Sequence, residues 1–214
     1  MFIKNVMIPK SHCYVVQKDD SLEVALNLLD KEDLEGVPVL DGNHYVGTVT
    51  RFKIYHHYFQ FGTDPKQFLA ERTCGDFAST TIPPVTEEAI FESAIFQFKH
   101  FPLIAVVDDT QKFLGIVTRH DVLSQLESSF GLNVSGIRIM LSIVETKGRL
   151  ARLAEIVSSF YEQIISIVLL DETDKLVRRI VLKIEKTEKT ESHLDKLLKK
   201  LETEGFRILH ISED

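Results

Sequence analysis

The sequence lacks the features that are typical of membrane, secreted, disulfide-rich and zinc-binding proteins. No apolar run approaches the length that crosses a bilayer, and the N-terminus lacks the long apolar centre of a signal peptide. Only two cysteines occur, Cys13 and Cys74, and they form no C-x-x-C pair. These absences argue against a membrane partner, a disulfide framework and a zinc site. We therefore expect a cytoplasmic protein with buried thiols.

Positive charge is also scarce. The 25 Lys and Arg residues face 32 Asp and Glu residues, which gives a formal net charge of −7. Because proteins hold nucleic acid through concentrated lysine and arginine, this balance argues against nucleic acid as a partner. The lysines between positions 183 and 200 alternate with glutamates, which is typical of a solvated face.

Catalytic motifs are missing as well. The chain contains no Gly-x-Ser-x-Gly elbow, P-loop, His-Glu-x-x-His pattern or Rossmann glycine set. His56 and His57 are adjacent, so on a helix they point to different sides, and no acidic or cysteine ligand accompanies them. We predict no catalytic residue and no metal site, and we expect that the protein is not an enzyme.

An internal repeat fills the first three fifths of the chain. Residues Gly47-Thr48-Val49-Thr50-Arg51 are matched by Gly115-Ile116-Val117-Thr118-Arg119. Both copies predict the order strand, helix, strand, turn, strand, helix. Asp41-Gly42 predicts a tight hairpin turn, and Asp20 predicts the N-cap of the first helix. Each copy is too small to bury its own sheet well, so the two copies should pack together.

The end of the second copy permits two interpretations. In the structural one, Thr118 and Asp121 form a capping box at the start of a helix. In the functional one, the free amides of that helix face an anion such as a phosphate, and the Asp121 carboxylate accepts from a ribose diol. The first copy has Lys53 where the second has Asp121.

The pattern changes after a small-residue segment at residues 131–136, which predicts a domain boundary. Beyond it, a strand at 137–145 precedes a helix with an apolar side. Two strands at 163–171 and 176–186 then follow, joined by a turn at 172–175. A last helix ends at Gly205 before a strand at 206–212. This βαββαβ order is the ferredoxin-like pattern.

Residues 1–130 resemble a tandem pair of CBS domains, a Bateman module. The resemblance rests on the repeated Gly-x-Val-Thr-Arg ends, the Val6-Met7-Ile8-Pro9 opening and the Val37-Pro38-Val39-Leu40-Asp41 strand. The C-terminal part, with Glu145-x-x-Gly148-x-Leu150-Ala151, is similar to an ACT domain. The resemblance implies an α+β fold with three parts: a first CBS domain and inter-repeat helix at 1–70, a second CBS domain at 71–132, and an ACT-like domain at 137–214.

The resemblance implies a regulatory homodimer that binds AMP, ADP, ATP or S-adenosylmethionine. By position, Thr118 would hold phosphate, Asp121 the ribose hydroxyls, and Arg119 a phosphate or a partner subunit. The adenine slot would be lined by Thr81, Ile82, Leu103 and Ile104. In the first copy Thr50 and Arg51 survive, but Lys53 replaces the ribose aspartate. The resemblance therefore implies one complete nucleotide site and a degenerate one.

Three functions stay open at this point. The first is a nucleotide sensor that acts on its ACT-like domain or on a metabolic enzyme. The second is a scaffold that dimerises without a ligand. The third is a sensor of an amino or organic acid, held at the turn of Gly148, although a simple tight turn is the slightly favoured explanation of Gly148. The order of the domains also resembles that of acetoin-utilisation proteins, which implies a role in acetoin or acetate metabolism.

Overall fold

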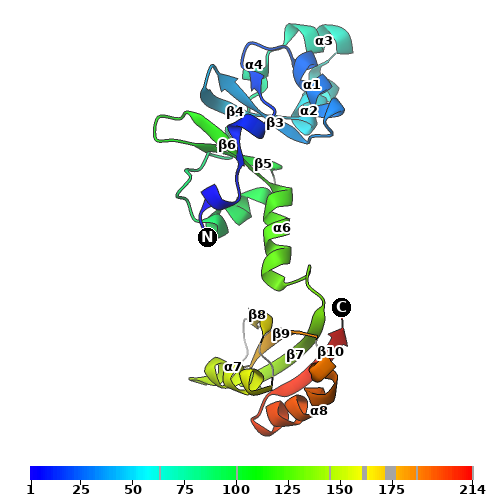
Figure 1. The fold of residues 1–214 in the computed structure, drawn as a ribbon. Coiled ribbons are helices and arrows are strands. Elements are labelled where there is room, and N and C mark those ends of the chain that lie inside the picture. The colour runs from blue at the N-terminus through cyan, green and yellow to red at the C-terminus, as the bar shows by residue number, and fades with distance from the viewer. Residues whose placement is uncertain are drawn as a thin grey trace. The chain divides into compact units, whose positions relative to one another are not determined.

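The computed structural model describes residues 1–62, 64–99, 101–144, 146–160, 163–171, 177–186 and 188–213. The chain divides into two compact units, Met1–Leu123 and Ser124–Asp214 (Figure 1). Helix α6, Arg119–Phe130, carries residues of both units.

The first copy of the repeat forms a three-stranded sheet in the order β2-β3-β4. Its elements are β2 Val16–Gln17, α1 Leu22–Lys31, β3 Gly36–Asp41, β4 His44–Thr50 and α2 Arg51–Phe61. The predicted turn joins β3 to β4, and Gly42 adopts a φ of 61°, a conformation that glycine enters at little cost. The predicted cap of α1 was wrong by one residue. The Ser21 hydroxyl accepts from the Val24 amide, whereas the Asp20 carboxylate accepts from the Gln17 amide.

Two short helices, α3 Pro65–Glu71 and α4 Cys74–Phe77, lead to the second copy. Its elements are α5 Phe91–Ala94, the 3₁₀ helix η3 Ile95–Lys99, β5 Leu103–Val107, β6 Phe113–Thr118 and α6. The helical segment before the paired strands is thus less regular in the second copy, where it consists of α5 and η3, than in the first copy, where it is α1. Strands β5 and β6 pair antiparallel, as β3 and β4 do.

Each copy completes the sheet of the other. Strand β1, Ile8–Pro9, comes from the start of the chain but pairs antiparallel with β6 of the second copy. Conversely, Ser79, which precedes the second copy, exchanges two backbone hydrogen bonds with Thr48 of β4. A buried cluster drawn from both copies lies between the sheets, formed by Leu40, Leu103, Ala105, Phe113 and Ile116. The two copies therefore fold as one unit.

The second unit has the βαββαβ order that the sequence predicts. Its elements are β7 Gly136–Val144, α7 Arg149–Phe160, β8 Ile164–Asp171, β9 Val177–Glu185, α8 Glu188–Thr203 and β10 Arg207–Glu213. The sheet order is β10-β7-β9-β8, and all three pairings are antiparallel. Alternate residues of β7 and β9 pack with α7 and α8 in one core. Glu145 and the predicted turn at 172–175 lie outside the described residues.

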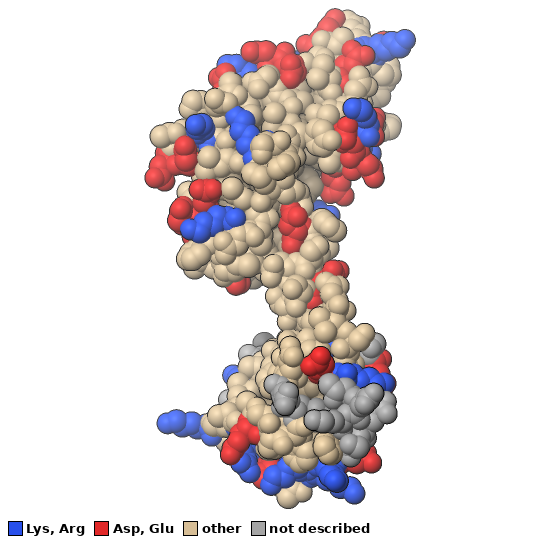
Figure 2. Space-filling view, viewed as in Figure 1, with Lys and Arg blue, Asp and Glu red and all other residues tan. Residues whose placement is uncertain are grey.

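Surface charge is mixed on both units. Figure 2 shows acidic and basic side chains interspersed over the visible face of each unit, without an extended basic area. None of the helices in the described part of the chain combines the length and apolar composition that a bilayer crossing requires.

A substitution at Gly115 tests the pairing of β1 with β6. A Cβ at this position would overlap the carbonyl oxygen of Ile8, so β1 could not keep its place beside β6. We predict that Gly115→Ala lowers the free energy of unfolding by about 1–3 kcal/mol, as overpacking does, in chemical denaturation. Amide exchange at Ile8, which pairs with Ile116, should accelerate.

Gly42→Ala is the matched control, because a Cβ there meets no atom and only the positive φ opposes it. This variant should leave amide exchange at Ile8 unchanged. Equal acceleration in both variants would contradict the assigned pairing.

Candidate functional site

A groove runs along the seam between the two copies. It consists of two adjoining cavities of about 390 and 520 Å³. Both cavities are lined by five residues: Asp33, Leu34, Glu35, Pro102 and Arg119. We call these two cavities the seam groove. The first three shared residues precede β3, and the other two flank the strands of the second copy, so neither copy alone forms the groove.

The internal repeat places equivalent backbone on the two sides of the seam groove. The Arg51 amide donates to the Glu35 carbonyl at 3.0 Å, and the Arg119 amide donates to the Pro102 carbonyl at the same distance. Each arginine is the first residue of its helix, α2 or α6. The two Thr-Arg pairs predicted from the repeat therefore occupy corresponding positions.

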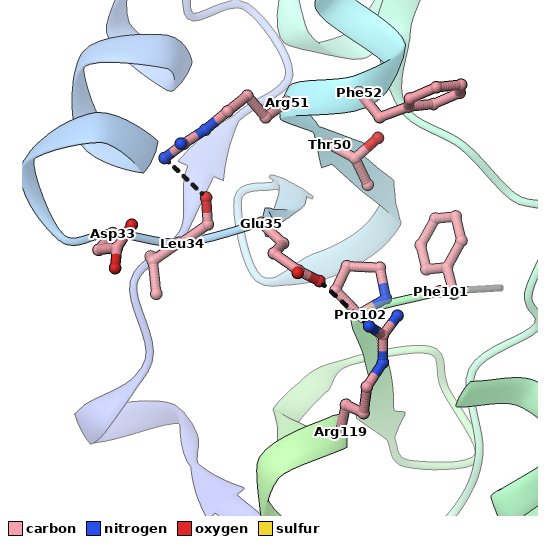
Figure 3. A pocket seen from close by; sticks show the side chains of 9 residues that line it. All are labelled: Asp33, Leu34, Glu35, Thr50, Arg51, Phe52, Phe101, Pro102 and Arg119. Atoms are coloured by element: carbon pink, nitrogen blue, oxygen red, sulfur yellow. Dashed lines mark hydrogen bonds and ion pairs between the residues drawn. The ribbon is translucent and has the colours of Figure 1, made fainter. Parts of the chain in front are cut away.

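The Arg51 guanidinium is held within the first copy. Its Nη2 donates to the carbonyl oxygens of Leu29 at 2.8 Å and Leu34 at 3.2 Å. The same nitrogen lies 3.3 Å from an Asp30 carboxylate oxygen. Figure 3 shows this side chain pointing towards the end of α1. Arg51 therefore fastens α1 to the start of α2, and binding an anion would break these bonds.

The Arg119 guanidinium is held far more loosely. Its Nη1 lies 3.8 Å from a Glu35 carboxylate oxygen, across the seam groove (Figure 3). The side chains are 44% and 70% exposed. An exposed ion pair of this length contributes about 0–1 kcal/mol. Arg119 can therefore turn to a bound anion at small cost.

Thr118 and Asp121 form the predicted capping box. The Asp121 amide donates to the Thr118 hydroxyl oxygen at 3.2 Å, and Oδ2 of Asp121 accepts from the Thr118 amide and hydroxyl at 2.8 and 2.6 Å. Thr118 lines the seam groove, whereas Asp121 is half-buried and is not among the residues that line it. Among the described residues, none donates to Oδ1 of Asp121. The structural interpretation is thus realised.

The first copy has a simpler cap. The Thr50 hydroxyl accepts from the Lys53 amide at 3.2 Å, and Thr50 is 8% exposed. Lys53 has no carboxylate with which to complete a box, and its positive charge opposes the dipole of α2. The two ends of the seam groove are therefore chemically unequal.

Of the four residues predicted for the adenine slot, one lines the seam groove. Leu103 lines the seam groove, but Ile104 is buried in the protein core. Thr81 and Ile82 do not line it, because the chain just before them pairs with β4 of the first copy. The start of the chain contributes Ile8, His12, Cys13 and Tyr14 to the lining of the seam groove. The Ile-Pro dipeptide occurs at residues 8–9 and again at residues 82–83, and this repeat was the sequence signal that the start of the chain could take part in the site.

The Cys13 thiol is a neutral part of the wall. Its Sγ donates to the carbonyl oxygens of Ile8 and Pro9 at 3.4 and 3.3 Å. Burial raises the pKa of the Cys13 thiol to about 11, against a smaller lowering by the backbone of Ile116. Cys13 is therefore poorly suited to act as a nucleophile at neutral pH. Within the described residues, no group of three or more His, Cys, Asp or Glu side chains is placed to hold a metal ion.

A comparison with protein families matches residues 3–59 and 74–128 to the CBS domain, which together are more than half of the chain. The chain belongs to the CBS-domain family. The two matched segments correspond to the two copies of the repeat, and the seam groove lies between them. A comparison with curated proteins finds no significant match.

Several solved CBS structures are similar to the chain. A CBS domain-containing protein of unknown function from Bacillus anthracis is 27% identical, with a TM-score of 0.54 and coverage of 59% of this chain and 93% of that one. A hypothetical conserved protein from Geobacillus kaustophilus is 25% identical, with a TM-score of 0.54 and coverage of 59% and 96%. CbpB from Listeria monocytogenes, solved in complex with c-di-AMP, is 27% identical, with a TM-score of 0.54 and coverage of 61% and 98%.

The raised pKa of Cys13 predicts slow alkylation. At pH 8 the thiolate fraction is about a hundredfold below that of an ordinary cysteine, because the thiolate is the reactive form. The rate with iodoacetamide, followed by mass spectrometry, should rise about tenfold per pH unit up to about pH 11. Cys74, whose pKa burial raises to about 12, should react more slowly still. A rate for Cys13 that levels off below pH 9 would contradict this assignment.

Proposed function

We propose that the CBS pair is a regulatory sensor that binds an adenine nucleotide in the seam groove. The observation that carries the proposal is Arg119, a loosely held guanidinium at the start of α6, inside a groove that both copies build. Guanidinium groups bind phosphate in a bidentate geometry, and a helix N-terminus favours negative charge. The c-di-AMP held by the Listeria CbpB, a relative with 27% identity, supports a ligand of this chemistry.

The two residues of the capping box, Thr118 and Asp121, have different proposed roles. Thr118 lines the seam groove and holds a phosphate together with Arg119. Asp121 accepts from a ribose hydroxyl through Oδ1, while Oδ2 keeps its bonds to Thr118. Leu103 and the segment from Ile8 to Tyr14 take the adenine ring, in place of Thr81 and Ile82.

The degenerate site lies at the other end of the seam groove. Thr50 and Arg51 line it, but Arg51 is committed to α1 and Lys53 supplies no acceptor for a ribose. We therefore expect one strong nucleotide site, beside Arg119, and one weak site, beside Arg51. A dinucleotide that carries two phosphates could reach from one to the other.

Ligand charge separates the candidate molecules. AMP, ADP, ATP and c-di-AMP all carry phosphate for Arg119, whereas S-adenosylmethionine carries none and offers only a carboxylate. The Glu35 carboxylate stands across the groove from Arg119 and opposes any anion until the ion pair opens. We therefore place the phosphate-bearing ligands ahead of S-adenosylmethionine.

The signal would pass to the second unit, which we propose to be a ferredoxin-like ACT domain at residues 137–214. The CBS domains would occupy residues 1–70 and 71–132. Helix α6 begins beside Thr118 at the seam groove and carries residues of both units, so it is the proposed connection. Homodimerisation, a metabolic enzyme as partner and a role in acetoin or acetate use rest on family resemblance and domain order, and they stay predictions.

Gly148 is explained by its backbone. Its φ of 87° is a conformation that other residues rarely adopt, and its carbonyl accepts from the Arg152 amide to start α7. A Cβ there would meet no atom within 4 Å. The turn interpretation therefore accounts for the glycine, and its role as an ACT ligand turn stays a prediction.

Titration calorimetry of the full chain with c-di-AMP, AMP, ADP and ATP tests the sensor. We predict that Arg119→Ala weakens binding about ten- to a hundredfold, because a hydrogen bond to a charged group contributes about 1.5–3 kcal/mol. The stability of this variant should change by less than about 1 kcal/mol, since its ion pair with Glu35 is exposed. Glu35→Gln should tighten binding.

Arg72→Ala is the matched control, because Arg72 is an exposed arginine of the first unit that does not line the seam groove. It should bind as the wild type does. Equal losses in both arginine variants would indicate non-specific charge attraction. Absence of binding by the wild type would favour a ligand-free scaffold.

A further inference from the structure

The first unit contains another cavity, which lies among the helices α1, α2 and α3 (Figure 1). Its volume is about 210 Å³. None of its described lining residues lines the seam groove, so the two sites are separate. We call it the aromatic cavity, because its lining includes the four aromatic side chains of Tyr55, Tyr58, Phe59 and Phe68.

The wall of the aromatic cavity is formed by carbon atoms. The other described lining residues are three aliphatic residues and a proline, and no polar atom of the described residues reaches the cavity surface. Two of the aliphatic residues, Leu26 and Ile54, pack in the core of the first copy. A carboxylate, a phosphate or a primary ammonium would lose its hydrogen bonds to water here and gain none. The wall therefore excludes groups of these kinds.

The aromatic rings are inclined to one another. The centroid of the Tyr58 ring lies 6.1 Å from that of Phe59, at an interplanar angle of 62°, and 5.6 Å from that of Phe68, at 58°. Parallel stacked rings cover each other's faces, whereas inclined rings leave faces open to a shared space. The face of an aromatic ring is electron-rich and attracts a cation. This arrangement therefore suits a cation.

The aromatic cavity joins a buried floor to an exposed entrance. Ile54 is 1% exposed, whereas Tyr55 and Phe59, one turn apart on α2, are 42% and 85% exposed. A ligand can thus enter from solvent without a rearrangement of the core. Once bound, it would cover aromatic surface that otherwise faces water, which is favourable.

The charge of the first unit also favours a cation. Residues 1–123 include 11 Lys and Arg against 17 Asp and Glu, so this unit carries −6 of the formal net charge of −7. A net negative potential attracts cations and repels anions. Among organic cations, a quaternary ammonium needs no hydrogen bond, because methyl or methylene groups surround its nitrogen. It meets both requirements, a positive charge and a wall of carbon.

We propose that the aromatic cavity binds a small quaternary ammonium compound of about the size of choline. The trimethylammonium group lies among the four rings, held by cation–π attraction and by burial of its methyl groups. The rest of the ligand extends to solvent at the entrance. An apolar cavity of about 150 Å³ is large enough to bind benzene, so the aromatic cavity has room for this group.

A charged ligand and its neutral analogue test the proposal. Choline and 3,3-dimethylbutan-1-ol have the same shape, but the alcohol has carbon in place of the nitrogen and no charge. Ligand-observed NMR with the full chain follows the methyl signal of each compound. We expect choline to bind about tenfold more tightly than the alcohol or better, because each cation–π contact adds to the effect of burial. Equal affinities would overturn the proposal, as would no binding of choline.

Phe59→Leu locates the site. The change keeps an apolar side chain at an exposed position of α2, so the variant should melt as the wild type does. It should lose about fivefold in affinity for choline, because one cation–π contact is gone, and little in affinity for the alcohol. Unchanged affinity for choline in this variant would overturn the assignment.

Phe61→Leu is the matched control. Phe61 is the last residue of the same helix and is 70% exposed, but it does not line the aromatic cavity. This variant should bind choline as the wild type does. A loss equal to that of Phe59→Leu would show that choline responds to exposed aromatic rings in general, which would overturn the proposal.

Light scattering distinguishes a small ligand from a second copy of the chain seated on α2. We expect the mass of the wild type in solution to be the same with and without choline. A second copy in the aromatic cavity would compete with choline, so the mass would fall as choline is added, and Phe59→Leu would weaken self-association. Either result would overturn the proposal.

Discussion

The exchange of short backbone segments between the two CBS copies is the constraint on which the first unit depends. Residues 8–9 complete the sheet of the second copy, and Ser79 bridges the sheet of the first. Backbone groups must be paired when they are buried, so neither sheet edge is satisfied without the other copy. Gly115 makes the close approach of β1 possible. The seam groove exists because this exchange brings the two copies face to face.

The same constraint explains why two matching Thr-Arg pairs differ in chemistry. In the first copy, α1 is ten residues long, and Arg51 donates to carbonyls at and beyond its end. The corresponding helix of the second copy has four residues before it continues as a 3₁₀ helix. Arg119 makes its ion pair across the seam with Glu35 instead. One repeat thus yields a structural arginine and an available one.

The sequence predicted much of the fold because periodicity and turn residues are local signals. The repeat, the Asp41-Gly42 turn and the βαββαβ order of the second unit are all present in the structure. The capping box of Thr118 and Asp121 was also predictable, since it needs only residues three apart.

Other features were out of reach because they depend on non-local pairing. The Ile-Pro dipeptide occurs in both copies, but the sequence does not state which sheet each one joins. Thr81 and Ile82 were therefore predicted to line an adenine slot, whereas residues from the start of the chain line the seam groove. The commitment of Arg51 to α1 and the gathering of four aromatic side chains around one cavity likewise follow from tertiary contacts. These features are set by the three-dimensional structure and not by the local sequence.

Hydrogen exchange of the full chain with and without c-di-AMP tests the central claim, that both copies build one nucleotide site. The account predicts slower amide exchange at residues 33–36 of the first copy and at residues 118–121 of the second, because both segments line the seam groove or cap the helix beside it. Slowing in both segments at once would show a shared site. Slowing confined to one copy or to the second unit, or none at all, would contradict it.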